Sequence, residues 1–373
     1  MKKELRLLIA TPLYPPDDGG PSTYAKLLET ALPSHGVNVS LVVFRTYKQY
    51  PKILRHLLYT IALFRRARNV DMIFALDPIS VGVPAMIVSI LLRKTLVLKV
   101  VGDYAWEQGR QRFGVTSELD DFVHARQTSF PVRMFQYLER SVADRASVVV
   151  VPSKYLKKIV QQWGVDEAKI VVVYNAFTPD VPSRSKQELR EVYGIDCTTI
   201  ISVGRMVPWK GFTGLMDAMA IVTKKYPDAK LLIAGSGSPD PYMRYANEKK
   251  YTFVEFIGNI EHRELMERMR ASDCFALNTA YEGLSHLLLE SMAVGVPVVT
   301  TAVGGNVELF EGGTRGVLVP YNDIEALAHA ILEIVNDPQK AELYAEEGKH
   351  FVSNFTQEHM VEGTVRVLRS LVG

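Results

Sequence analysis

The sequence predicts an α/β fold of two domains, each built on a parallel β-sheet. Short apolar runs that suit buried strands alternate with segments of helical periodicity along the whole chain. Several of these runs end in a glycine and a polar residue, which is typical of strands whose carboxyl ends line a ligand site. The length of 373 residues suits two domains better than one.

The first half begins as a strand, a glycine loop, a helix and a second strand, the order of a βαβ unit. The loop 12–21 contains Gly19 and Gly20, which suit either an anion site or a simple connection. We expect Ser22 or Thr23 to cap the next helix. The pattern G-x-G-x-x-G is absent, so no dinucleotide fingerprint is present. Expected strands are 5–10, 37–44, 72–76, 96–101, 146–151 and 170–174. Expected helices are 22–32, 51–68, 81–92, 135–143 and 154–164, with irregular chain over 108–130.

The best domain boundary is the proline- and serine-rich segment 179–185. It gives domains over residues 1–178 and from 179 onward. Expected strands of the second domain are 199–203, 230–234, 253–257, 274–278, 298–301 and 316–319. Expected helices are 212–225, 265–271, 285–294, 324–335 and a helical region from 337 to the end, interrupted near 354–355.

Residues 282–305 combine a loop, a helix, a strand and a glycine turn around two carboxylates. Glu282 lies in the loop and Glu290 in the helix. Gly283 permits close backbone approach to a ligand, Ser285 can cap the helix, and Gly295 suits its left-handed end. Helical spacing places Leu284, Leu287, Leu288, Ser291 and Met292 on the packed side, with His286, Glu290, Ala293 and Val294 opposite. A helix N-terminus attracts phosphate and carboxylates bind hydroxyls, so this segment suits a polyhydroxylated anionic ligand.

Asp103 follows the strand 96–101, where a parallel sheet binds ligands, and is a candidate for catalysis. Gly-Asp is also ordinary turn chemistry, which is the alternative. The two cysteines suit a reducing compartment and offer no metal spacing. The longest apolar stretch, 79–92, is too short to span a bilayer. These two observations favour a cytoplasmic protein. We expect no nucleic-acid partner, because the net charge is only +2 and no aromatic platform accompanies the basic residues.

Positive charge is concentrated in the first half. Residues 30–70 contain no Asp or Glu but seven Lys and Arg. A basic, leucine-rich helix over residues 45–68 could lie peripherally on an anionic membrane. The alternative is an ordinary amphipathic helix with snorkelling cations.

These motifs together resemble the retaining GT-B glycosyltransferases of glycosyltransferase family 4. The resemblance rests on Gly19-Gly20, on Gly204-Arg205 with Lys210-Gly211, and on Glu282 followed by Glu290, and it covers nearly the whole chain. It implies two Rossmann-like domains facing a central cleft. The first, residues 1–178, would bind the acceptor, and the second, residues 179–355, a nucleotide-sugar donor. Residues 356–373 would form a helix that crosses back to the first domain.

The resemblance also implies roles for individual residues. Arg205 and Lys210 would neutralise the donor diphosphate, Glu290 would hold the ribose and Glu282 would lie near the transferred sugar. Other residues would complete the donor site, through backbone amides near the diphosphate and the sugar or through contacts with the nucleotide base. They are Gly19, Gly20, Gly204, Gly258, Asn259, Ile260, Gly283, Leu284 and Ser285. The family often has a histidine where this chain has Gly102-Asp103.

The implied activity is retaining, metal-independent hexosyl transfer from a nucleoside-diphosphate sugar to a hydroxyl acceptor, without a cofactor. A lipid-linked acceptor in polysaccharide or glycolipid assembly would suit the basic helix. Alternatives are a non-hydrolysing sugar-nucleotide 2-epimerase on the same fold and a non-catalytic carbohydrate-binding scaffold. A hydrolase with both carboxylates flanking one bond is weaker, since Glu282 and Glu290 acquire different roles.

Overall fold

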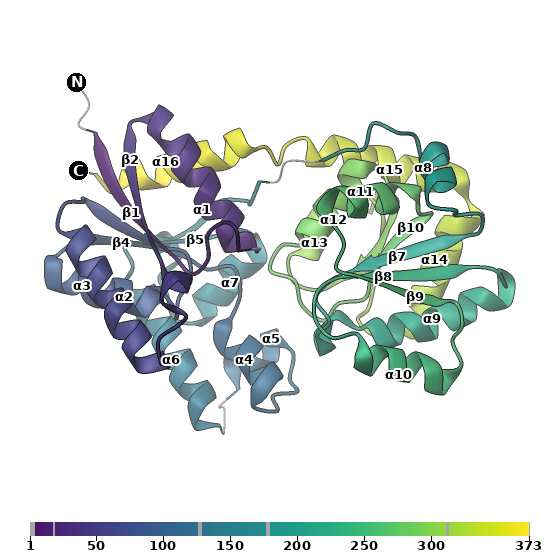
Figure 1. Ribbon diagram of the computed structural model, residues 1–373, viewed down its shortest axis with the longest axis horizontal. Helices are drawn as coiled ribbons and strands as arrows, with labels where there is room; N and C mark the ends of the chain where they lie inside the picture. Colours follow the sequence, from purple (N-terminus) through teal and green to yellow (C-terminus); the bar gives the residue numbers. More distant parts are fainter. Residues whose placement is uncertain (1–3, 18, 126–128, 177–179, 311–312, 373) are drawn as a thin grey trace. The chain divides into compact units, whose positions relative to one another are not determined.

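The computed structural model describes the chain apart from residues 1–3, 18, 126–128, 177–179, 311–312 and 373. The chain folds into two compact units (Figure 1). Unit 1 comprises Met1–Asn175 and Gln357–Gly373, and unit 2 comprises Ala176–Thr356. The boundary predicted between residues 178 and 179 lies outside the described residues.

Unit 1 is built on a six-stranded parallel sheet in the order β2-β1-β3-β4-β5-β6. The strands are β1 (Leu5–Thr11), β2 (Val37–Val43), β3 (Met72–Ala75), β4 (Thr95–Lys99), β5 (Val148–Val151) and β6 (Ile170–Val172). The helices are α1 (Gly20–Ala31), α2 (Lys52–Ala67), α3 (Gly82–Leu92), α4 (Tyr104–Arg112), α5 (Leu119–His124), α6 (Phe130–Arg145), α7 (Lys154–Gln162) and α16 (Gln357–Ser370). Helices α1 and α16 cover one face of the sheet, and α2, α3 and α6 cover the other (Figure 1). Central strands such as β5 are wholly buried and apolar because both faces are covered.

Unit 2 repeats this plan with the strand order β12-β11-β10-β7-β8-β9. The strands are β7 (Thr199–Val203), β8 (Lys230–Ala234), β9 (Val254–Gly258), β10 (Cys274–Leu277), β11 (Val298–Thr301) and β12 (Val317–Val319). The helices are α8 (Lys186–Val192), α9 (Phe212–Lys225), α10 (Asp240–Lys249), α11 (His262–Ala271), α12 (His286–Val294), α13 (Asn306–Leu309), α14 (Ile324–Asn336) and α15 (Pro338–Val352). The predicted α/β class with two Rossmann-like units is confirmed.

The last helix, α16, returns from unit 2 and packs on unit 1. The Thr364 hydroxyl lies 3.5 Å from the Tyr24 hydroxyl of α1, and the Arg369 guanidinium donates to the His35 carbonyl at 2.7 Å. The two ends of the chain therefore belong to the same unit.

Several segments differ from the sequence expectations. Within the stretch expected to be irregular, residues 108–112 and 119–124 are helical, because α4 buries Ala105, Trp106 and Gly109 on one side and α5 follows it. Helix α8 was not predicted, although Ser185 and Glu188 form a capping box at its start. Helix α10 was also missed.

Candidate active site

The carboxyl ends of the unit 2 strands carry most of the predicted site residues. Gly204 and Arg205 follow β7, Asn259 and Ile260 follow β9, and the loop after β10 leads to Glu282. Because the strands are all parallel, these segments lie along one edge of the sheet. This is the edge at which open α/β sheets bind ligands.

One hollow of about 180 Å³ brings four of the predicted residues together. Its lining includes Gly204, Arg205, Asn259 and Ile260. Gly235, also in the lining, has a φ of 142°, and a Cβ there would lie 1.9 Å from the carbonyl oxygen of Gly204. Its amide donates to the Gly258 carbonyl at 2.8 Å, which joins the ends of β8 and β9. Gly258 therefore supports this hollow through its backbone.

Lys210 is held in place by the turn that carries it. The 3₁₀ turn Pro208–Lys210 ends at Gly211, whose φ is 57°. A Cβ on Gly211 would lie 2.1 Å from the Asn278 carbonyl oxygen, so only glycine fits against the end of β10. The Asn278 amide donates back to the Gly211 carbonyl at 3.0 Å. This attachment directs the Lys210 ammonium to the Glu282 carboxylate, with which it forms an ion pair.

The loop that carries Glu282 rests on the glycine turn after β11. The Gly305 amide donates to the Glu282 carbonyl at 2.9 Å. A Cβ on Gly305 would lie 2.2 Å from the Gly283 carbonyl oxygen, and a Cβ on Gly304 2.2 Å from that of Glu282. The loop and the turn thus fit closely because neither glycine carries a side chain.

Helix α12 follows this loop and begins after the buried residues Leu284 and Ser285. Ser285 occupies the N-cap position, but its side chain makes no capping hydrogen bond, so the predicted cap is wrong. Gly295 ends the helix in left-handed geometry as expected. The predicted outer side is also partly wrong. Ala293 and Val294 are buried, since α15 packs against α12.

Glu290 contacts a residue that the sequence did not single out. Its carboxylate lies 3.1 Å from Nε2 of His262, the first residue of α11. This hydrogen bond raises the pKa of His262 above its ordinary value, against the opposing effect of partial burial. The sequence offered one signal for this contact, because His262 lies at the start of a helix next to the predicted base-binding residues.

The remaining predicted residues belong to unit 1. Gly19 is the N-cap of α1, with a φ of 135°, and Gly20 is the first helical residue. The helix has no side-chain cap, so the predicted capping by Ser22 or Thr23 is wrong. A Cβ on Gly20 would meet no atom within 4 Å, so this position is open.

Asp103 is buried at 1% exposure and has a structural role in this fold. One carboxylate oxygen accepts from the Trp106 amide at 2.7 Å and caps α4, and the other accepts from the Trp163 indole at 3.2 Å. Glu139 accepts from the Tyr104 and Ala105 amides at the same helix start. Burial raises the pKa of Asp103 to about 6, and burial together with Asp103 raises that of Glu139. The geometry therefore favours helix capping over catalysis for Asp103.

A buried lysine at the end of β4 was also missed. Lys99 is 2% exposed, and its ammonium lies 3.9 Å from the ring centre of Tyr24. Within the described structure its Nζ has no hydrogen-bond partner. Burial lowers its pKa to about 7.

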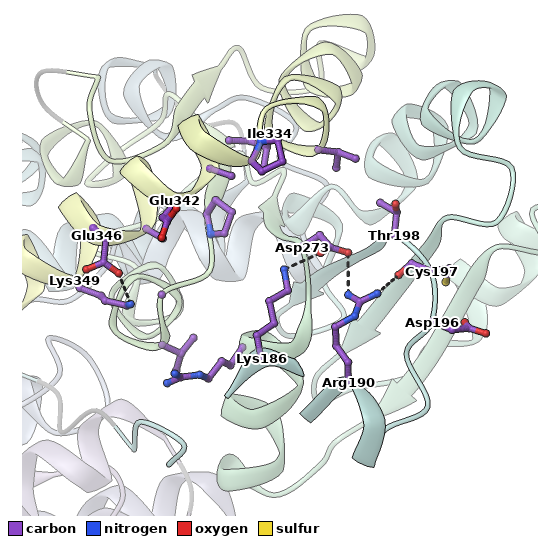
Figure 2. Close-up of a pocket in the computed structure, with 18 residues that line it drawn as sticks. Lys186, Arg190, Asp196, Cys197, Thr198, Asp273, Ile334, Glu342, Glu346 and Lys349 are labelled. Atoms are coloured by element: carbon purple, nitrogen blue, oxygen red, sulfur yellow. Dashed lines mark hydrogen bonds and ion pairs between the residues drawn. The ribbon is translucent and has the colours of Figure 1, made fainter. Parts of the chain in front are cut away.

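A larger cavity of about 620 Å³ lies at the opposite, amino-terminal edge of the unit 2 sheet (Figure 2). Five of its charged side chains pair with one another. Asp273 accepts from Lys186 at 2.7 Å and from Arg190 at 3.1 Å, and Lys349 pairs with Glu346 at 2.6 Å (Figure 2). Asp273 thereby attaches α8 to the sheet, and the cavity contains none of the predicted site residues.

Among the residues that the structure describes, no group of three or more His, Cys, Asp or Glu side chains is placed to hold a metal ion. No helix in the same part of the chain is both long and apolar enough to cross a membrane.

Comparisons with known proteins agree with the fold of the two units. A family model described as Glycosyltransferase Family 4 matches residues 9–181. A second, described as Glycosyl transferases group 1, matches residues 185–351. The two models thus meet at the segment between the two units.

Two curated relatives are mannosyltransferases. The chain is 31% identical over 203 residues to the GDP-mannose-dependent monoacylated alpha-(1-6)-phosphatidylinositol monomannoside mannosyltransferase of Corynebacterium glutamicum, covering 52% of this chain and 53% of that protein. It is 29% identical to the GDP-mannose-dependent alpha-(1-6)-phosphatidylinositol monomannoside mannosyltransferase of Mycolicibacterium smegmatis, covering 57% and 59%. The chain thus spans little more than half the length of these relatives.

Solved structures share the fold over nearly the whole chain. Sucrose-phosphate synthase from Thermosynechococcus elongatus superposes with a TM-score of 0.80 at 20% identity, covering 98% of this chain and 99% of the other. The Anabaena protein Alr3699/HepE, in complex with UDP-glucose, superposes with a TM-score of 0.77 at 21% identity, covering 98% and 100%.

Proposed function

Because the chain belongs to the GT-B glycosyltransferases of family 4, we propose that it transfers a hexosyl group from a nucleoside-diphosphate sugar to a hydroxyl acceptor. The observation that carries this proposal is that Arg205, Lys210 and Glu282 lie in turns after the carboxyl ends of one parallel sheet, where Lys210 pairs with Glu282, and that the Glu282 loop leads into α12, which carries Glu290. Two cations next to sugar-binding carboxylates suit a donor that combines a diphosphate with a sugar.

The leaving group of this reaction is a nucleoside diphosphate, so negative charge develops on its oxygens. Arg205 and Lys210 would stabilise that charge in place of a metal ion. The diphosphate would bind the Lys210 ammonium in competition with Glu282, which already orients it. Backbone amides at the start of α12 would add donors, since a helix N-terminus favours anions.

We propose that the reaction retains the anomeric configuration by attack on the face from which the diphosphate departs. The bond from the anomeric carbon to the phosphate oxygen breaks, and the acceptor oxygen bonds to that carbon. The acceptor proton passes to the leaving phosphate oxygen. Glu282 would lie near the sugar, and Glu290 would hold the ribose hydroxyls.

The donor and acceptor are proposed from the relatives and from the charge of unit 1. GDP-mannose and UDP-glucose are the first donors to test, because they are named for a curated relative and for a solved structure. We propose that the acceptor is linked to a lipid. Residues 45–68 would bind the cytoplasmic face of the membrane that carries it. The acid-free run 30–70 supports this choice.

A thermal-shift screen with UDP, GDP, ADP and their sugars tests donor binding. A nucleotide at about 100 times its dissociation constant should stabilise the protein by about 2.7 kcal/mol. The stabilising nucleotide sugar is then incubated with the protein, first alone and then with a lipid-linked hydroxyl acceptor. Formation of a glycosylated acceptor of the donor's anomeric configuration supports the proposal. Epimerised donor in the absence of acceptor would overturn it in favour of an epimerase.

A further inference from the structure

Helix α2 presents two apolar stripes, one buried and one exposed. Tyr59, Leu63 and Ala67 face the core. Ile53, Leu57 and Ile61 recur every fourth residue on another side, with exposed fractions of 88%, 56% and 40%. An ordinary amphipathic helix would carry polar residues there. The cation-snorkelling alternative does not explain an isoleucine that is almost wholly exposed.

The neighbouring helix α3 has the same character. It packs against α2 in the layer below the unit 1 sheet (Figure 1). Its exposed side consists of Ile87, Ile90 and Leu91, at positions i, i+3 and i+4. Ser89, its only polar side chain, is buried. Nothing polar therefore faces solvent from this helix.

Helix α6, which also packs against α3, adds a stripe of two aromatic side chains and a methionine. Phe130, Met134 and Tyr137 are 70%, 44% and 72% exposed. Three adjacent helices thus each expose large apolar side chains at helical spacing. Such exposure on a soluble surface marks an interaction site.

Arginines lie beside these stripes. Arg65 and Arg66, near the end of α2, line a hollow of about 380 Å³ together with Arg6, Asn38, Ser40 and Asn69. Arg6 pairs with Asp71 at 2.8 Å, whereas neither Arg65 nor Arg66 forms an ion pair within the described structure. Lys94, just after α3, donates to the Val70 carbonyl at 2.7 Å, so the ends of α2 and α3 lie together. The arginine hollow therefore adjoins the apolar end of α3.

We propose that α2, α3 and α6 form a docking face for an anionic lipid bilayer, with Arg65 and Arg66 of the hollow taking phosphate headgroups. The exposed apolar side chains would enter the headgroup boundary, and the cations would contact the charged surface. A second copy of this chain is disfavoured, because a twofold contact through this face would place its basic residues opposite each other. The proposal is independent of the transfer reaction, and it extends the docking region beyond residues 45–68.

Co-sedimentation of the full chain with phosphatidylglycerol and phosphatidylcholine vesicles tests the proposal without any donor or acceptor. We expect binding to phosphatidylglycerol only, reversed by high salt. Arg65→Gln/Arg66→Gln should weaken it about twenty-fivefold, since each basic residue near an anionic surface contributes about fivefold. Lys224→Gln/Lys225→Gln, which removes two adjacent exposed lysines from unit 2, should leave it unchanged.

A second pair of variants tests the apolar contribution. Leu57→Ser should weaken vesicle binding about tenfold, whereas Leu343→Ser, at the same 56% exposure in unit 2, should not. Equal melting temperatures would show that all variants are folded. Equal binding to both lipids, no binding to either, or equal losses in test and control variants would overturn the proposal. A concentration-dependent dimer that Leu57→Ser dissociates would assign the face to a second copy and overturn it as well.

Discussion

The Lys210 ammonium forms an ion pair with the Glu282 carboxylate, and the two side chains are only 10% and 13% exposed. The two residues come from different turns, one after β7 and one after β10. At such low exposure the two charges compensate each other, and loss of one partner leaves the other poorly solvated. The proposed diphosphate ligand would compete with Glu282 for the same ammonium.

Lys210→Met should therefore lower both stability and turnover. It removes a cation from the proposed leaving-group site, so turnover should fall about a hundredfold. It also leaves Glu282 unpaired, which should reduce the free energy of unfolding by about 2 kcal/mol. Denaturant unfolding and initial-rate measurements check the two effects. Lys224→Met, at an exposed position in unit 2, is the control, and a Lys210→Met variant with unchanged turnover would contradict the site assignment.

Glu282→Gln should change nucleotide binding and transfer in opposite directions. The variant releases Lys210 from its ion pair, so the free nucleoside diphosphate should bind severalfold more tightly. Transfer should nevertheless fall, because the proposed sugar-side carboxylate is lost. Calorimetric titration with the diphosphate and an end-point transfer assay separate these results. Weaker diphosphate binding would show that Glu282 does not compete for Lys210.

Lys99 should destabilise the protein in a pH-dependent way. Burial lowers its pKa to about 7, so the unfolded chain binds the proton more strongly than the folded one between about pH 7 and 10.5. The destabilisation is complete below that window and is relieved as pH rises through it. Lys99→Met should thus raise the free energy of unfolding by about 2 kcal/mol at pH 6 and by less near pH 10. Lys158→Met, at an exposed position of α7, should show no such trend, and a pH-independent effect of Lys99→Met would count against burial as its cause.

The alternation of strands and helices was predictable because it depends on local patterns. Buried runs such as Val148–Val151 and the helix end at Gly295 follow from apolar periodicity and backbone preference. Helices α4 and α5 were missed because both are short, and because part of the support for the start of α4 comes from a distant side chain. Glu139, which binds the start of α4, lies 35 residues from Tyr104.

The contacts within the site were less predictable than its residue types. Lys210 and Glu282 are separated by 72 residues, and tertiary packing determines the positions of the two turns that carry them. His262 carries no motif, and its pairing with Glu290 depends on how α11 packs against α12. Asp103 follows a strand as expected, but whether its carboxylate is exposed depends on Trp106 and Trp163.

His262 should make nucleotide binding sensitive to pH through Glu290. The hydrogen bond to Glu290 raises the pKa of His262, so the stabilising ion pair is present below about pH 6.5 and is lost as pH rises through the raised value. Protonated His262 would compete with the ribose for the Glu290 carboxylate. His262→Gln should therefore bind a nucleoside diphosphate more tightly than the wild type at about pH 5.5 and equally well at about pH 8.5. The ratio of the variant's affinity to that of the wild type, taken at each pH, cancels the titration of the ligand itself.

The same variant should lose less than about 1 kcal/mol of stability at the lower pH, because His262 is half exposed. His350→Gln, at an exposed position of α15, is the matched control. An affinity ratio that stays constant across this range would show that His262 does not compete for Glu290.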